Sequence, residues 1–135
     1  LRVHDSVFVP LAKWSMLLAG NYRCVLKDGI QSIKDSVHAD IEESRSVYSW
    51  VFDLSVSLGA SPEDLVPFEK YANATLSLLN PSSAARALAN GSTNIERLDR
   101  LVQSIAASQN IKSDAVDRTV SVVDARLDAN RQKAA

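Results

Sequence analysis

Residues 93–105 read Thr-Asn-Ile-Glu-Arg-Leu-Asp-Arg-Leu-Val-Gln-Ser-Ile, and this stretch decides the fold class. Its apolar residues recur at three- and four-residue intervals, which places them on one face of an α-helix. They are Ile95, Leu98, Leu101, Val102 and Ile105. Thr93 and Glu96 have the spacing of a capping box, in which each side chain satisfies a free backbone N–H at the helix start. The pattern predicts an amphipathic helix that begins at Thr93.

Segments of similar periodicity lie on both sides of this stretch. Downstream, Ser113 and Asp114 start a last helix, and we expect residues 128–135 to fray because they are polar. Upstream, Ser82 starts a short helix and Gly59 ends a long one. The expected helices cover residues 9–25, 37–58, 62–66, 68–79, 83–89, 93–105 and 113–127, with a helical turn at 30–33. A strand is expected only at residues 2–8.

Length and composition indicate a single domain. The chain has 135 residues, 46% of them hydrophobic, and a formal net charge of −1. This charge gives no general attraction to nucleic acid or to an acidic membrane. No apolar run approaches the roughly 18 residues that a bilayer-spanning helix needs. We therefore expect one all-α domain over residues 1–135, with six or seven helices and neither a nucleic-acid nor a membrane partner.

Few residues offer the chemistry of a catalytic or metal site. The single cysteine, Cys24, excludes an internal disulfide and is interpreted as a small buried residue. His4 and His38 have no second histidine or carboxylate at ligand spacing, which favours a solvent-facing role for both. The acidic run at 40–43 is interpreted as a solvated helix face. Without a Gly-x-Gly-x-x-Gly turn, the chain has no dinucleotide-binding Rossmann motif.

The beginning of the chain suggests a larger protein. It starts at Leu1, with no initiator methionine and no signal-peptide pattern. We expect an excised or processed piece whose function is shared with a part outside this sequence. A free cysteine without a secretion signal favours the cytoplasm.

Two stretches carry a family resemblance. One begins Ser82-Ser-Ala-Ala-Arg86, continues through Thr93-Asn-Ile-Glu96 and ends at Asn110-Ile-Lys-Ser113; the other is Lys13-Trp-Ser-Met-Leu-Leu-Ala-Gly-Asn21. They resemble the C-terminal helical domain of ketopantoate reductases (2-dehydropantoate 2-reductases). In that family a serine opens a short helix, a Thr-Glu-Ile-Asp-type helix start follows, and a Gly-Ile or Gly-Val turn precedes the last helix. The second stretch is similar to the family's Trp-x-Lys-Leu-x-x-Asn helix, and Gly59 falls where its long second helix ends in glycine.

The resemblance implies a fold and a function. The fold would be like the C-terminal domain of 6-phosphogluconate dehydrogenase, following a Rossmann domain that is absent from this chain. The parent protein would be an NADP-dependent oxidoreductase of pantothenate biosynthesis, which reduces a 2-keto acid to a 2-hydroxy acid with hydride from NADPH. This domain would be inactive alone. Its partners would be the Rossmann domain, the small 2-keto acid and, as a further possibility, a second copy in a homodimer.

Several positions depart from the family's pattern. The family lysine that protonates the ketone oxygen aligns with Met16, and a thioether has no proton to give. The catalytic glutamate aligns with Asn94, and the asparagine of the first helix aligns with Gly20. Arg86 stands where the family has aspartate, and Arg100 where it has glycine. The parent is therefore either a divergent reductase of another substrate or a protein that has lost the reaction.

The resemblance nominates four site residues. Ser82 matches the family serine, and Asn94 and Asn21 would join it in binding the substrate. Lys13 lies three residues before Met16, close to the same helix face, and is the candidate general acid in a shifted register. We expect these four residues around one cleft. The alternative is a non-enzymatic helical module for dimerisation or protein interaction, which the upstream reading frame would distinguish.

Overall fold

The computed structural model describes residues 10–135. Within that part, helices form all the regular secondary structure, and Val25 and Ile30 make one isolated antiparallel bridge. The expectation of an all-α chain with six or seven helices is confirmed, because seven α-helices are present in the described residues. The strand expected at 2–8 and His4 lie outside the described residues.

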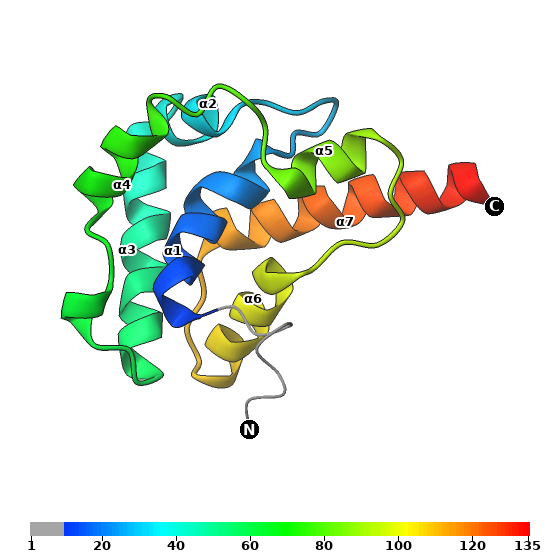
Figure 1. The fold of residues 1–135 in the computed structure, drawn as a ribbon. Helices are drawn as coiled ribbons and strands as arrows, with labels where there is room; N and C mark the ends of the chain where they lie inside the picture. The colour runs from blue at the N-terminus through cyan, green and yellow to red at the C-terminus, as the bar shows by residue number, and fades with distance from the viewer. Residues whose placement is uncertain (1–9) are drawn as a thin grey trace.

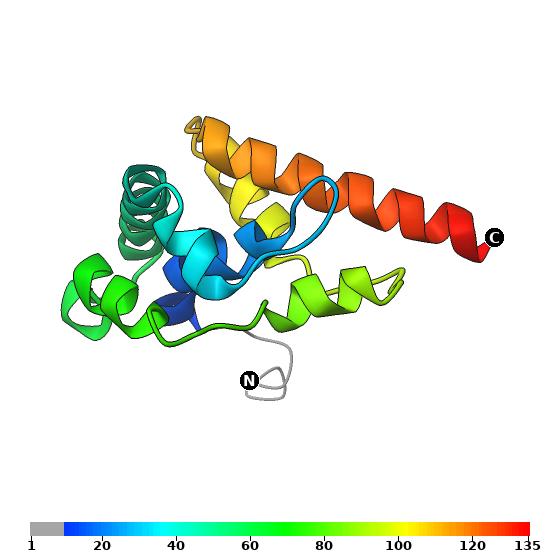
Figure 2. The same cartoon turned by 90° about the horizontal axis from the view of Figure 1, so that it is seen from above.

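The helices surround one central segment. The α-helices are α1 (Trp14–Met16), α2 (Ile33–His38), α3 (Ile41–Ser57), α4 (Phe68–Thr75), α5 (Ser83–Ala89), α6 (Leu98–Ser108) and α7 (Asp114–Ala134). A 3-10 turn, η4 (Pro62–Asp64), lies between α3 and α4. Figure 1 shows α3 and α4 on one side of α1, and α5, α6 and α7 on the other. The C-terminal end of α7 extends past the other elements, as Figure 2 also shows.

The central segment is helical but irregular. It combines the 3-10 turns η1 (Leu11–Lys13) and η3 (Tyr22–Cys24) with α1 and a π-helical turn, η2 (Leu17–Asn21), and we call residues 11–24 the N-terminal helix. A regular helix over 9–25 was the expectation. The departure has a physical cause, because side chains from other elements donate hydrogen bonds to its carbonyl groups. Tyr71 donates to the Met16 carbonyl (3.1 Å) and Ser36 to the Gly20 carbonyl (2.8 Å).

The expected helix over 37–58 is two helices. Ser32 caps α2 by accepting a hydrogen bond from the backbone N–H of Asp35, and Asp40 caps α3 by accepting one from Glu43. The helical turn expected at residues 30–33 does not form separately, because Ile33 is already the first residue of α2. The helix expected over 68–79 ends at Thr75. The end of α3 is as expected, since Gly59 follows it with φ of +112°, the left-handed conformation that glycine adopts most easily.

The capping box at Thr93 is absent, because α6 begins at Leu98. Tyr22 explains the later start. Its hydroxyl accepts a hydrogen bond from the Leu98 N–H (2.9 Å), where a helix leaves a donor free, and donates to the Glu96 carbonyl (2.6 Å). Residues 93–97 are consequently an irregular segment held against the N-terminal helix.

The last helix does not fray after Leu127, since α7 continues to Ala134. Its final turns are tied to the rest of the molecule. Asn130 donates hydrogen bonds to the carbonyls of Leu88 (3.0 Å) and Ser92 (2.8 Å), and Arg131 donates to that of Thr93 (3.0 Å). These contacts join α7 to the segment that follows α5.

The caps expected for α5 and α7 are confirmed. Ser82 accepts a hydrogen bond from the Ala85 N–H, and Ser113 from the Val116 N–H. One hydrophobic core connects the N-terminal helix to helices α2 to α7. Its largest fully buried side chains include Tyr48, Leu18, Leu54, Leu88, Leu127 and Val102. Trp14 belongs to this core, whereas Trp50 is only partly buried against it.

Candidate functional site

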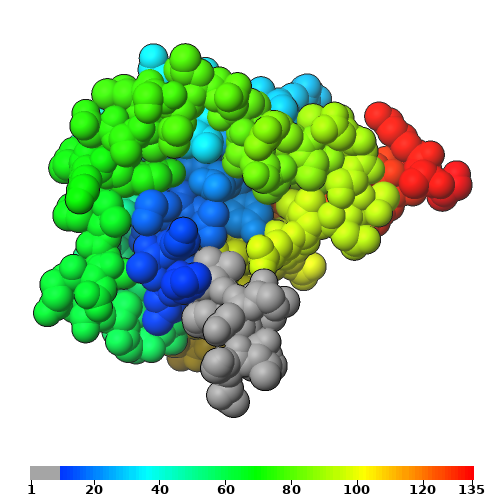
Figure 3. All heavy atoms as spheres, in the orientation of Figure 1, coloured from blue at the N-terminus to red at the C-terminus, as the bar shows by residue number. Residues whose placement is uncertain are grey.

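A hollow of about 480 Å³ lies between the N-terminal helix, α5 and residues 93–97. Its polar lining includes Asn21, Ser83, Asn94 and Glu96, and its apolar lining includes Leu17. We call it the Asn21–Asn94 hollow. Figure 3 shows the N-terminal helix in blue, exposed between the green of α4 and the yellow-green of α5 and the segment after it. Two of the four nominated residues therefore line one hollow.

Ser82 is buried next to the Asn21–Asn94 hollow and does not line it. Only 3% of the residue is exposed, and its hydroxyl donates to the Asn21 carbonyl (2.8 Å) while it accepts the capping bond from Ala85. Both hydrogen-bonding roles of the hydroxyl are thus satisfied within the protein. The hydroxyl of Ser82 holds α5 against the N-terminal helix, and its neighbour Ser83 faces the hollow.

Lys13 lines a second hollow, of about 260 Å³, along the same helix. We call it the Lys13 hollow. It shares Leu17 and Asn21 with the first hollow, and Met16, Tyr71 and other apolar residues complete it. Lys13 and Asn94 therefore line neighbouring hollows, and Asn21 borders both.

Gly20 makes the close packing beneath Met16 possible. A Cβ atom at position 20 would lie 1.9 Å from the Tyr71 hydroxyl oxygen. Without that atom the ring of Tyr71 fits, and its hydroxyl donates to the Met16 carbonyl. Burial raises the pKa of the Tyr71 hydroxyl above its ordinary value. Tyr71 accordingly fills the space that a longer side chain at position 20 would need.

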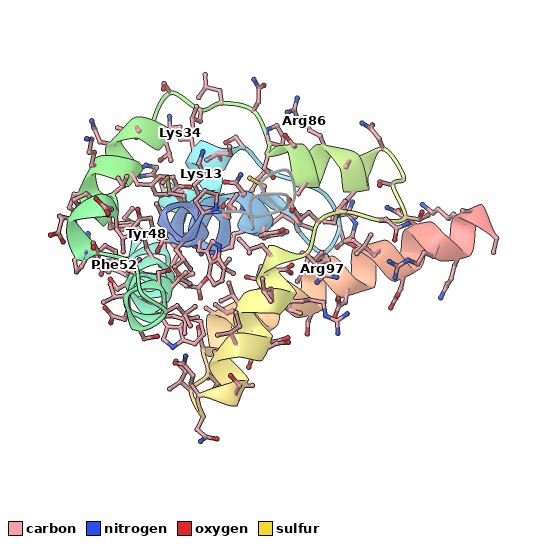
Figure 4. All side chains as sticks on the ribbon, turned by 60° about the horizontal axis from the view of Figure 1, so that its bottom comes forward. Lys13, Lys34, Tyr48, Phe52, Arg86 and Arg97 are labelled. Carbon is pink, nitrogen blue, oxygen red and sulfur yellow. The ribbon has the colours of Figure 1, made fainter. Side chains whose placement is uncertain are left out.

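The segment that carries Asn94 and Glu96 is held in place by a buried ion pair. The Arg97 guanidinium donates two hydrogen bonds to the carboxylate of Asp99, which is 0% exposed, and a third to Asp124 on α7. Bidentate pairing of this kind fixes direction as well as distance. Tyr22 anchors the same segment, and burial raises the pKa of its hydroxyl to about 12. Figure 4 shows Arg97 at the start of α6.

Glu96 is the site residue that sequence reasoning missed. The expected capping box gave its carboxylate a structural role at the start of a helix. Because α6 begins two residues later, the carboxylate is exposed at the Asn21–Asn94 hollow instead. The backbone distortion that releases it depends on Tyr22, 74 positions away in the chain, and no local pattern reports such a contact.

The remaining candidates have structural surroundings. Cys24 is buried as expected; its thiol donates to the Gly20 carbonyl, and burial raises its pKa. His38 is not solvent-facing, because its Nε2 atom lies 2.9 Å from the Ala72 carbonyl oxygen. Asp40 is solvated, whereas Glu43 is partly buried and pairs with arginine side chains.

Residues 10–135 contain no group of three or more His, Cys, Asp or Glu side chains arranged to hold a metal ion. None of the helices in the same residues combines the length and apolar character that a membrane crossing requires.

Comparisons with known proteins identify no relative. No family model matches the chain, and no curated protein or solved structure matches it with significance.

Proposed function

We propose that this chain is the substrate-binding helical domain of an NADPH-dependent reductase related to ketopantoate reductases. The observation that carries the proposal is the Asn21–Asn94 hollow, which is lined by two nominated residues and backed by a third, Ser82. In this proposal a small 2-keto acid binds there and is reduced to the 2-hydroxy acid.

Two backbone features support the proposal. Gly59 is left-handed at the end of α3, where the family's long helix ends in glycine. Asn110 has φ of +62°, a conformation uncommon for a residue other than glycine, at the turn where the family has Gly-Ile or Gly-Val before its last helix. At both places the family that the chain resembles has glycine, the residue that adopts a left-handed conformation most easily.

The residues of the hollow suit a small polar ligand. The carboxamide groups of Asn21 and Asn94 can each donate two N–H groups to carboxylate or ketone oxygens. Leu17 and the alanines of α5 offer an apolar wall for the rest of the molecule. Such a mixture of apolar surface and a few directed polar groups is typical of small-molecule sites.

The chain does not fit NADPH by itself. It has no Gly-x-Gly-x-x-Gly turn to hold a pyrophosphate at a helix N-terminus. Neither hollow supplies such a turn, and among residues 10–135 the cation that lines them is Lys13 alone. We therefore assign the cofactor to a Rossmann partner domain.

Two groups are candidates for the proton donor. Lys13 is the candidate from the sequence, and Glu96 is the candidate from the structure, because it lines the same hollow as Asn94. If Lys13 donates the proton, Lys13→Ala in the active parent protein lowers kcat by about 10²–10⁴-fold, the usual worth of a general acid. If kcat of the Lys13→Ala variant stays within about twofold of the wild-type value, Lys13 is not the general acid.

Binding of a keto acid tests the proposal directly. We would titrate the ¹⁵N-labelled chain with 3-methyl-2-oxobutanoate and follow the side-chain amide signals. We expect the signals of Asn21 and Asn94 to shift, and Asn94→Ala to weaken binding, while Asn73→Ala on the exposed surface of α4 leaves it unchanged. The proposal would be contradicted if only the signals of other residues shifted, or if Asn94→Ala and Asn73→Ala bound the keto acid with equal affinity.

An exposed leucine cluster favours the alternative, a module for dimerisation or protein interaction. Leu76, Leu78 and Leu79 follow α4 and are 47%, 42% and 67% exposed. Large apolar side chains that gather at a surface often mark an interface. Sedimentation measurements at increasing concentration would separate the two functions: a stable dimer that is lost in Leu79→Ser and binds no keto acid supports the alternative.

A further inference from the structure

Lys13 places a positive charge at the edge of the Lys13 hollow. Lys13 is exposed, forms no ion pair within residues 10–135, and lines the hollow with no acidic residue beside it. Lys34 is a second cation nearby. It follows the lining residue Ile33, and its backbone N–H donates to the carbonyl of Leu78, another lining residue. In the view of Figure 4, Lys13 and Lys34 are both labelled between α4 and α5.

The interior of the hollow is apolar. Met16, Leu17, Ile33 and Leu78 contribute thioether and aliphatic surface. Tyr71 also lines it, but its hydroxyl already donates to the Met16 carbonyl, so the ring offers mainly its apolar face. The carboxamide of Asn21 is the remaining polar group of the lining.

We propose that the Lys13 hollow binds a small monocarboxylate with an apolar chain. The carboxylate pairs with the Lys13 ammonium and accepts from the Asn21 amide, while the chain packs among Met16, Ile33 and Leu78. A hollow of about 260 Å³ has room for a small acid of this kind. Lys34 adds attraction for an anion at the entrance.

The inference goes beyond the proposed reduction, because it requires neither a ketone group nor a cofactor. A saturated acid that cannot be reduced is the appropriate probe. The inference can hold while the Asn21–Asn94 hollow binds no keto acid, and the proposed reduction can hold while the Lys13 hollow binds nothing.

The test is a titration of the ¹³C-methyl-labelled full chain with 4-methylpentanoate, followed by the methyl signals of Met16, Ile33 and Leu78. The neutral amide, 4-methylpentanamide, has nearly the same shape and serves as the matched ligand. We expect the acid to shift these signals and to bind about threefold to fivefold more tightly than the amide, the gain from one partly exposed ion pair. Added salt should reduce this difference.

Two pairs of variants separate charge from packing. Lys13→Gln should remove the preference for the acid, whereas Lys133→Gln at the exposed end of α7 should keep it. Leu78→Ala should weaken acid and amide alike, whereas Leu79→Ala, outside the lining, should weaken neither. Equal affinity of acid and amide, an unchanged preference in Lys13→Gln, or shifts that map elsewhere would each overturn the proposal.

Discussion

At the residue scale, Gly20 has the most specific packing requirement. The Tyr71 ring and hydroxyl occupy the volume next to its Cα atom, and the carbonyl of Gly20 accepts from both Ser36 and Cys24. This one residue thereby joins α2 and α4 to the N-terminal helix. The alignment to the family's asparagine did not predict such a role, because the partner, Tyr71, is distant in sequence.

Gly20→Ala should destabilise the protein by about 1–3 kcal/mol, the usual cost of an extra methyl group in a packed core. Gly29→Ala is the matched control, since nothing lies within 4 Å of a Cβ atom there. Urea unfolding followed by circular dichroism measures both. The double variant Gly20→Ala with Tyr71→Phe should recover part of the loss, because the clashing oxygen is removed. Equal stability of the two single variants would contradict the packing argument.

At the element scale, local signals located most helices, but distant contacts decided their ends. Ser82 and Ser113 cap their helices as their positions predict, since a cap is an interaction within one turn. The capping box at Thr93 has an equally good local pattern and does not form, because Tyr22 binds the N–H of Leu98. The candidate site follows the same division: Asn21 and Asn94 could be nominated from the sequence, and Glu96 could not.

Tyr22→Phe should destabilise the protein by about 1–3 kcal/mol, because the N–H of Leu98 loses its partner in a buried position. Tyr48→Phe is the comparison: it removes one hydrogen bond, to the carbonyl of Val66, and leaves no N–H unpaired. A larger fall in the urea midpoint for Tyr22→Phe, with an unchanged slope, is the expected result. Equal midpoints would show that the hydroxyl does not hold the start of α6.

At the scale of the whole molecule, one apolar core spans the described chain, and the two hollows lie on the surface of its central helix. The parts that line them are far apart in sequence and meet only because α7 and Tyr22 hold residues 93–97 in place. The all-helical class followed from apolar periodicity. The pairing of the helices could not be predicted in this way, because periodicity identifies the apolar face of a helix but not the helix that packs against it.

The chain alone should not bind NADPH with useful affinity. It lacks the glycine-rich turn that holds a pyrophosphate, and within the described part of the chain the two hollows offer one lining cation. Isothermal titration calorimetry with NADPH should give no heat of binding at micromolar concentrations. A micromolar Kd for this chain would contradict the assignment of the cofactor to a partner domain.

The stability of the protein should fall steeply at alkaline pH. Burial raises the pKa of Tyr22 and of Tyr48 to about 12, and it raises that of Tyr71 as well, all from an ordinary value of 10.0. A group whose pKa is higher in the folded state binds its proton more tightly there. Its contribution to stability is complete below pH 10 and is lost as the pH rises towards the folded-state pKa.

Each such tyrosine should remove up to about 1.4 kcal/mol of stability per pH unit over that interval. Urea midpoints measured from neutral pH to pH 11 would show the fall, and tyrosinate absorbance should rise together with unfolding rather than before it. Tyr48→Phe should make the alkaline dependence shallower, because one of the three groups is gone. Normal titration of all three tyrosines in the folded protein would contradict their burial, since an exposed phenol ionises near its ordinary pKa without unfolding the chain.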